Sequence, residues 1–341
     1  MVLIMRTIEW KAGVVLTVDQ TRLPNEVVSL RLTTCRQVAS AIKSMKIRGA
    51  PLIGVAAAYG LALTAYHSKA KETSKLIKEI EESADLLKRT RPTAVNLFWA
   101  VDRIMKRSQK TLGGADEVAN ATLDEAQKMA DEDVEINRKI GENGSRLVNN
   151  GDVILTHCNA GALATVDFGT ALGVIRAAWE EGKKIRVIAT ETRPKLQGAR
   201  LTTYELKRDG IPVTLITDSM VGYVMSKKLV NKVIVGADRI VRDAVINKIG
   251  TYTVALVAHE HNVPFYVAAP KSTFDLEGVS EEVIIEERNP EEVTHFNRVR
   301  IVPEGVGALN PAFDITPFKF VSAVICETGV LYPSEFLVDR L

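Results

Sequence analysis

The spacing of hydrophobic residues changes near the middle of the chain. In the first half, apolar residues recur three and four positions apart over 71–89 and 117–148, which is the period of an amphipathic helix. Two shorter segments, 14–18 and 27–32, are typical of strands and flank a turn at 23–25. The first half is therefore predicted to be mainly helical after a short stranded opening.

From about residue 152 onward, short β-branched runs alternate with helical patterns. The runs are predicted to be strands and lie at 153–155, 185–188, 213–216, 233–235 and 265–267. The helical patterns between them cover 163–181, 198–208, 220–229 and 250–261. This order of strand, helix and strand predicts repeated βαβ units, and hence an α/β fold with a parallel sheet.

Composition and charge place the chain among ordinary globular proteins. Its 341 residues are 46% hydrophobic and 25% charged, and the formal net charge is +2. These proportions are typical of a soluble domain, and the small net charge gives no general attraction to nucleic acid or to a membrane surface. We therefore expect neither nucleic acid nor a membrane as a partner.

The cysteines and the apolar stretches indicate a cytoplasmic location. Cys35, Cys158 and Cys326 are far apart and form no CxxC pair, which disfavours a disulfide framework or a zinc site. The N-terminal residues lack the pattern of a secretory signal. The longest apolar stretch, 50–66, contains glycines and is too short to span a bilayer.

Two residues that follow predicted strands are candidates for chemistry, because ligands of parallel sheets bind beyond the carboxyl ends of the strands. Cys158 precedes a glycine and a predicted helix, where backbone N–H groups and the helix dipole lower a thiol pKa. Alternatively, it is a small buried hydrophobe. Asp238 follows an apolar run, where desolvation raises a carboxyl pKa and suits general acid–base catalysis. Alternatively, it forms an ion pair with Arg239 or another cation.

Polar residues that follow two further predicted strands are suited either to binding a sugar phosphate or to forming a solvated loop. Arg193 and Lys195 are suited to bind a phosphate, and Gln197 to bind a sugar hydroxyl. The alternative for this segment is a solvated loop with an ion pair. Asp218 is suited equally to a functional role and to capping the helix that follows it.

Further positions have the chemistry of an anion site. Lys248 is suited to neutralise a phosphate and Asn247 to hold a hydroxyl, at the start of another predicted helix. Arg48 and Gly49 precede the long apolar helix, and helix N-termini attract anions. Arg91 adds a cation before the next helix. The alternative for the last two segments is an ordinary helix start.

The sequence lacks the fingerprints of several other enzyme classes. It contains no GxGxxG after a strand and no GxxxxGK[ST], so nucleotide binding is not indicated. The spacings HxxxH and HExxH are absent, which disfavours a zinc enzyme. There is no GxSxG elbow either. We therefore expect no metal and no cofactor.

Eight segments carry a family resemblance that extends over nearly the whole chain. They are IEW (8–10), KIRGAPLIG (46–54), RPTAVNL (91–97), CNAGALAT (158–165), ETRP (191–194), GADRI (236–240), NKIGTY (247–252) and NPAFD (310–314). Together they resemble the signature blocks of the 5-methylthioribose-1-phosphate isomerases.

The resemblance implies an aldose–ketose isomerase of methionine salvage, which converts 5-methylthioribose 1-phosphate to 5-methylthioribulose 1-phosphate without a cofactor. It implies a mainly helical N-terminal domain over residues 1–125 and a Rossmann-like α/β catalytic domain over 126–341, in a homodimer. It assigns Cys158 and Asp238 as the catalytic pair. The substrate-binding positions that it implies are Arg48, Gly49, Ala50, Arg91, Gln197, Asn247 and Lys248.

Two alternatives stay open within the same superfamily. It includes ribose-1,5-bisphosphate isomerases, and also the regulatory subunits of the translation-initiation guanine-nucleotide exchange factor, which are binding proteins. The presence of both Cys158 and Asp238 favours an enzyme. Ala160 stands where many relatives have threonine, and 240–247 is one residue shorter than the commonest form, so the preferred sugar stays open. The residues expected to give an apolar lining for a methylthio group are Val95, Leu97, Phe98 and Trp99.

Overall fold

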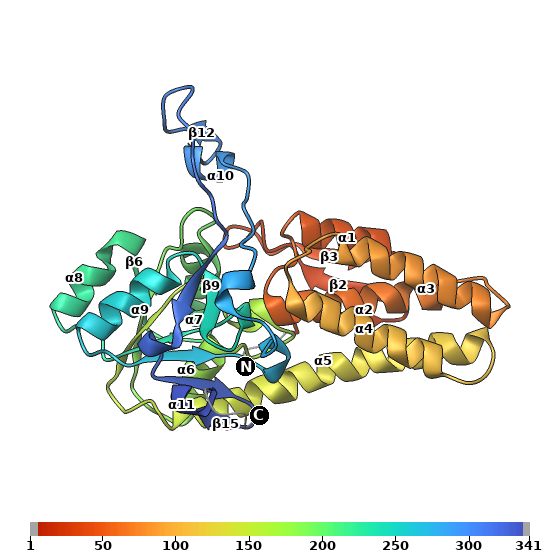
Figure 1. Cartoon of the computed structure of the whole chain (residues 1–341), viewed down its shortest axis with the longest axis horizontal. Coiled ribbons are helices and arrows are strands. Elements are labelled where there is room, and N and C mark those ends of the chain that lie inside the picture. The colour runs from red at the N-terminus through yellow and green to blue at the C-terminus, as the bar shows by residue number, and fades with distance from the viewer. Residues whose placement is uncertain (1–5, 337–341) are drawn as a thin grey trace.

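The computed structural model describes residues 6–336 and consists of a helical region beside an α/β region (Figure 1). The helical region opens with an antiparallel sheet of β1 (Ile8–Lys11), β2 (Val14–Val18) and β3 (Ser29–Leu32). The helices that follow are α1 (Cys35–Lys43), α2 (Ala50–His67), α3 (Thr73–Lys88), α4 (Val95–Lys110) and α5 (Ala115–Ser145). The prediction of a mainly helical first half is confirmed.

Helix α2 is the centre of the helical region. Thirteen of its eighteen residues are buried, and it packs against α1, α3, α4 and α5. By length and composition it could cross a membrane, but 72% of that apolar window is buried inside the protein. A helix that is apolar on all sides belongs in a core, so α2 is a core helix and fixes where its own N-terminus lies.

The α/β region is built on a seven-stranded sheet. Its strands, in sheet order, are β15 (Gly329–Leu331), β14 (Ala323–Cys326), β10 (Phe265–Ala268), β7 (Lys232–Val235), β4 (Val153–Thr156), β5 (Arg186–Thr190) and β6 (Val213–Ile216). Every neighbouring pair is parallel except β14 and β15. The predicted α/β fold with a parallel sheet is confirmed, and its five predicted strands are present.

The helices of this region are α6 (Ala171–Glu180), α7 (Thr203–Arg208), α8 (Val221–Ser226) and α9 (Thr251–Glu260). The continuous helix predicted over 163–181 is wrong. Only a 3₁₀ turn at Ala162–Ala164 follows β4, and α6 begins later. Gly169 explains the break, because its φ is +85° and an added Cβ would lie 2.5 Å from the Cα of Gly161.

Two smaller sheets complete the described chain. A three-stranded antiparallel sheet contains β8 (Arg239–Ile240), β9 (Ala244–Lys248) and β13 (Phe313–Pro317). An arm projects from the body with α10 (Glu291–Thr294), β11 (His295–Phe296) and β12 (Val299–Arg300) (Figure 1). The short α11 (Pro333–Phe336) follows β15. The sequence pattern did not predict the arm, since its strands have two residues each.

Helix α5 connects the two regions. It is a single helix of 31 residues that packs against both α2 and α6. It therefore crosses the boundary predicted between residues 125 and 126 without a linker, and that division stays a prediction. Within it, Asp133 is buried and accepts the N–H of Val166 at 2.7 Å. Burial raises the pKa of Asp133 to about 7.

This raised pKa predicts a stability effect of Asp133→Asn that grows with pH. The folded protein holds a proton on Asp133 up to about pH 7, whereas the unfolded chain loses it near the ordinary value of 3.8. The protonated carboxyl therefore stabilises the folded state fully at pH values below the pKa of the unfolded chain. This contribution is lost as pH rises through the pKa of the folded protein, about 7. We expect urea unfolding to show that the free energy of unfolding of Asp133→Asn, relative to the wild type, is higher by several kcal/mol at about pH 8 than at about pH 4. Asp131→Asn, whose exposed carboxylate pairs with Arg6 at 2.7 Å, is the control, and an equal effect there would contradict the assignment.

Candidate active site

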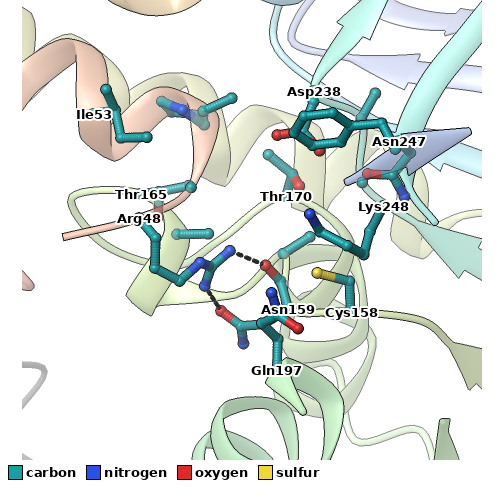
Figure 2. Close-up of a pocket in the computed structure, with 18 of the residues that line it drawn as sticks. Arg48, Ile53, Cys158, Asn159, Thr165, Thr170, Gln197, Asp238, Asn247 and Lys248 are labelled. Atoms are coloured by element: carbon teal, nitrogen blue, oxygen red, sulfur yellow. Dashed lines mark hydrogen bonds between the residues drawn. The ribbon is translucent and has the colours of Figure 1, made fainter. Parts of the chain in front are cut away.

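One cavity brings together all nine residues that the sequence singled out as catalytic or substrate-binding. It lies where the N-terminus of α2 faces the carboxyl ends of β4 and β7, so both regions contribute to it (Figure 2). The nine lining residues are Arg48, Gly49, Ala50, Arg91, Cys158, Gln197, Asp238, Asn247 and Lys248. The geometry makes a shared site possible, while the role of each residue stays a prediction.

Cys158 is held in a strained backbone conformation directly after β4. Its φ is +63°, which is uncommon for a residue other than glycine. Its N–H donates to Thr192 Oγ1 at 2.9 Å, and its carbonyl accepts Thr202 Oγ1–H at 2.6 Å. Strain of this kind persists where surrounding contacts over-determine it, and it clusters at functional sites. The two threonines therefore fix the thiol at the cavity wall.

The thiol is not activated in the way that the sequence suggested. Burial raises the pKa of Cys158, and the nearby charges of Arg48 and Lys248 only partly oppose the effect. The expectation that a helix dipole lowers this pKa is wrong, because only a three-residue 3₁₀ turn follows the cysteine. Cys158 is therefore a neutral thiol at neutral pH.

Asp238 lies between β7 and β8, and its N–H donates to the carbonyl of Ile246 at 3.0 Å. Burial raises the pKa of its carboxyl, and the charges of Lys248, Arg91 and Arg48 oppose this. The alternative of an ion pair with Arg239 is wrong, because Arg239 donates instead to Asp275, with Nε at 2.8 Å. The carboxyl of Asp238 faces the cavity with a raised affinity for a proton (Figure 2).

Arg48 and Gly49 bring a cation and open backbone to the cavity from the helical region. The guanidinium of Arg48 is buried and donates to both the side chain and the carbonyl of Asn159, the latter at 2.7 Å. Gly49 has a φ of +101°, and an added Cβ would lie 2.5 Å from the backbone of Ala164. Only glycine fits there. Ala50 then begins α2.

Lys248 and Asn247 enter the cavity from β9, not from a helix start as predicted. The ammonium of Lys248 donates to the carbonyl of Ala312 at 2.8 Å and lies 4.2 Å from the centre of the Phe313 ring. Burial lowers the pKa of Lys248, while Cys158 and Asp238 oppose that shift. The amide of Asn247 donates to Thr251 Oγ1 at 3.0 Å. Both polar groups are thus held in place by their own strand and its neighbours.

Arg91 and Gln197 complete the set. Arg91 donates to Glu286 at 3.0 Å and to Met45 Sδ at 3.6 Å. Gln197 is buried, and within residues 6–336 its Oε1 has no hydrogen-bond partner. Buried polar atoms are nearly always paired, so this unpaired amide oxygen suits a ligand hydroxyl.

The loop after β5 has a supporting role. Asp218 accepts the N–H groups of Thr192 and Arg193 at 2.8 and 2.7 Å. It therefore shapes the segment whose threonine holds Cys158. Arg193 donates to the carbonyl of Val293, and Lys195 pairs with Glu292 at 3.4 Å. Both cations line a neighbouring groove and not the cavity itself.

The cavity has further lining residues that sequence reasoning missed. Those that add apolar surface or polar groups include Met45, Ile53, His157, Asn159, Thr165, Thr170, Pro270 and Phe313. Ile53, Asn159, Thr165 and Phe313 lie inside three of the recognised segments, so the segments carried a signal. The apolar lining expected from Val95, Leu97, Phe98 and Trp99 is wrong, since none of these four lines the cavity. Among the described residues, no cluster of three or more His, Cys, Asp or Glu side chains suits a metal.

Comparisons with known proteins agree with this geometry. The model of the initiation factor 2 subunit family matches residues 46–333. The methylthioribose-1-phosphate isomerase of Acetivibrio thermocellus is 52% identical, over 96% of this chain and 97% of the relative.

Two solved structures share the whole fold. That of 5-methylthioribose 1-phosphate isomerase from Pyrococcus horikoshii OT3 is 45% identical, with a TM-score of 0.91 over 97% of this chain and 93% of the other. A protein from A. fulgidus, described as the translation initiation factor eIF-2B, subunit delta, is 54% identical, with a TM-score of 0.88 over 97% of both chains. The chain therefore belongs to the initiation factor 2 subunit family, and within it to the group that contains the methylthioribose-1-phosphate isomerases.

Proposed function

We propose that this chain is an aldose–ketose isomerase that converts 5-methylthioribose 1-phosphate to 5-methylthioribulose 1-phosphate in methionine salvage. The observation that carries the proposal is one cavity that holds a thiol, a carboxyl of raised pKa and three cations. A regulatory subunit needs a binding surface, but it has no need of a carboxyl and a thiol facing the same cavity. The high identity to isomerases over the full length supports the same conclusion.

The three cations suit the phosphate of the substrate. Arg48 and Arg91 come from the helical region and Lys248 from β9. A phosphate at neutral pH is anionic and takes several charge-assisted hydrogen bonds. Because the cations approach from both regions, a bound phosphate would join the two walls of the cavity.

The reaction requires the sugar ring to open while the phosphate stays on O1. The bond from C1 to the ring oxygen breaks, and the ring oxygen takes a proton. Hydrogen then moves from C2 to C1, and O2 loses its proton to become the ketone. Asp238 is suited to donate the proton to the ring oxygen, because its raised pKa favours the acid form. The carboxylate left behind is the base that accepts the proton from O2, so Asp238 ends the cycle as it began.

Cys158 has the place of the second catalytic group. In one route its sulfur carries a proton from C2 to C1 through an enol phosphate. In the other, hydride moves directly and the thiol stabilises charge. The enol-phosphate route needs the thiolate, because a neutral thiol has no free site for the proton from C2. The raised pKa of Cys158 therefore favours the hydride route, in which Asp238 serves the two oxygens.

The lining of the cavity favours a methylthio group over a second phosphate at C5. Among the described lining residues the cations are Arg48, Arg91 and Lys248, and Arg91 is already paired with Glu286 at 3.0 Å. Side chains of Met45, Ile53 and Phe313 supply apolar surface instead. A second phosphate would lose its hydration against such surface without a compensating charge.

Replacing the proposed acid should reduce the rate with little change in binding. For Asp238→Asn, we expect kcat on 5-methylthioribose 1-phosphate to fall by about 10²–10⁴-fold with KM nearly unchanged. Cys158→Ser should show a loss of similar size. The control is Asp243→Asn, in the exposed turn of the β8–β9 hairpin, where the carboxylate accepts the Ser280 N–H at 2.9 Å. Wild-type turnover by Asp238→Asn would refute the assignment. As an additional check, the wild-type rate should fall as pH rises through the raised Asp238 pKa.

We also propose that the chain works as a cytoplasmic homodimer. Its three cysteines are buried and unpaired, as a reducing compartment allows. Large apolar side chains on β6, α8 and α9 and in the segments next to α8 are exposed. The three elements lie at one end of the molecule (Figure 1). The exposed side chains are Leu215, Met220, Tyr223, Leu229, Tyr252 and Leu256. Apolar side chains exposed on an edge strand and on helices at the same end of the molecule suit a second copy of the chain.

The dimer proposal predicts the effect of charge on this face. Light scattering should give twice the 37.4 kDa chain mass for the wild type. Tyr223→Glu combined with Leu229→Glu should give the monomer mass, because both side chains are about half exposed and would meet the partner. A variant with charges at Ile284 and Leu309, which are exposed elsewhere, should stay dimeric. A monomeric wild type would contradict the homodimer, and a dimeric first variant would contradict this face.

A further inference from the structure

Glu205 is a fully buried carboxylate that does not line the cavity. It lies on α7 with no exposed surface. Its two oxygens accept four hydrogen bonds, from the Asn159 amide at 2.8 Å, Arg176 at 2.7 Å, and the N–H groups of Ala162 and Leu163 at 2.7 and 3.2 Å. These four donors satisfy both oxygens, as a buried charge requires.

The carboxyl is ionised in the folded protein. Burial acts to raise its pKa, but the charge of Arg176 and the hydrogen bonds of Asn159 and Arg176 outweigh that effect, and the pKa is lowered. Arg176 is also paired with Asp209 at 2.6 Å. The charge of Arg176 is thus partly balanced without Glu205, so neutralising Arg176 does not account for all the contacts of Glu205.

The negative charge of Glu205 holds the NH₂ group of Asn159 on the side away from Arg48, with a weaker contribution from Thr202 Oγ1 at 3.3 Å. A carboxylate only accepts hydrogen bonds, so the NH₂ group of Asn159 must point toward Glu205. The amide oxygen then points the other way, where it accepts a hydrogen bond from Arg48. Figure 2 shows Arg48 and Asn159 side by side at the cavity wall. The direction of the Arg48 guanidinium is therefore set by a group that the cavity does not contain.

The same carboxylate fixes the backbone that follows Cys158. Its bonds to Ala162 and Leu163 hold the 3₁₀ turn, and a Cβ on Gly161 would lie 2.3 Å from the Glu205 carboxylate. The Asn159 carbonyl, the second acceptor for Arg48, belongs to this segment. Both acceptors of Arg48 thus depend on Glu205.

We propose that Glu205 is a positioning residue, which acts through Asn159 to orient Arg48 toward the phosphate of the substrate. The proposal rests on the proposed function for the identity of that phosphate. It does not rest on turnover, because binding of inorganic phosphate at the same cations reports the orientation of Arg48 directly.

The first variant is Glu205→Gln, which keeps the size of the side chain and removes its charge. Arg176 retains the one remaining oxygen, so the new NH₂ group faces the NH₂ of Asn159. The Asn159 amide relieves this contact by turning, which removes the oxygen that accepts from Arg48. We expect the dissociation constant for inorganic phosphate, measured by calorimetry, to rise by roughly 10-fold or more, as expected for a lost charge-assisted hydrogen bond. KM for the sugar phosphate should rise by the same factor with a smaller change in kcat.

Two further variants separate positioning from folding. Asp209→Asn removes the other carboxylate partner of Arg176 without touching Asn159, and phosphate affinity should be unchanged. Glu205→Gln combined with Asn159→Asp exchanges donor and acceptor, since the glutamine now donates and the aspartate accepts from Arg48. This double variant should recover most of the phosphate affinity. If Glu205→Gln alone does not fold, the phosphate affinity of the double variant is the test of whether Glu205 acts through Asn159.

The proposal is overturned by any of three results. The first is a folded Glu205→Gln protein that binds phosphate as tightly as the wild type. The second is an equal loss of affinity in Asp209→Asn, or no recovery in the double variant. The third is a wild type that binds no phosphate. Phosphate binding without turnover of any sugar phosphate would refute the proposed function and leave the role of Glu205 standing.

Discussion

The contact of Arg48 with Asn159 is the interaction on which the site depends. Arg48 comes from the helical region, just before α2, and Asn159 follows the cysteine at the end of β4. Because α2 is buried by its neighbours, the position of Arg48 is fixed by the core of one region. Asn159, which accepts the hydrogen bonds of Arg48, is held by Glu205, so its position is fixed by the other region. The cavity exists where these two rigid parts meet.

Burial and positive charge oppose each other throughout this cavity. Burial raises the pKa of Cys158 and of Asp238 and lowers that of Lys248. The cations act in the opposite direction on the two acids. The result is a carboxyl with a raised affinity for a proton beside cations able to bind an anion, which is the combination that ring opening of a sugar phosphate requires. A more exposed site would lose the acid, and a site without cations would lose the substrate.

Much of the fold could be predicted from the sequence, because periodicity reports burial. The five β-branched runs all became strands of the parallel sheet, and α5 follows its amphipathic pattern. The helix predicted over 163–181 failed because the close approach of Gly161 and Gly169 is a tertiary contact. The residues Ala323–Cys326 form an inner strand that is as short and apolar as the predicted ones, so the pattern contained this strand and the prediction missed it. The arm around β11 and β12 was missed because its strands have only two residues each.

The candidate site was predictable as a set of residues but not as an electrostatic environment. All nine predicted residues line the cavity, since motifs and strand ends point to the same edge of the sheet. The direction of the Cys158 pKa was wrong, because a sequence does not show how deeply a thiol is buried. Glu205 was missed because it acts from behind the cavity, on a helix that carries no motif.

The most direct test of the whole account is turnover of the purified protein on 5-methylthioribose 1-phosphate beside ribose 1,5-bisphosphate, without added metal. The account predicts a clear preference in kcat/KM for the first, because the cavity offers cations for one phosphate and apolar side chains near them. Preference for the bisphosphate would keep Cys158 and Asp238 but contradict the assigned substrate. Turnover of neither would contradict the isomerase itself.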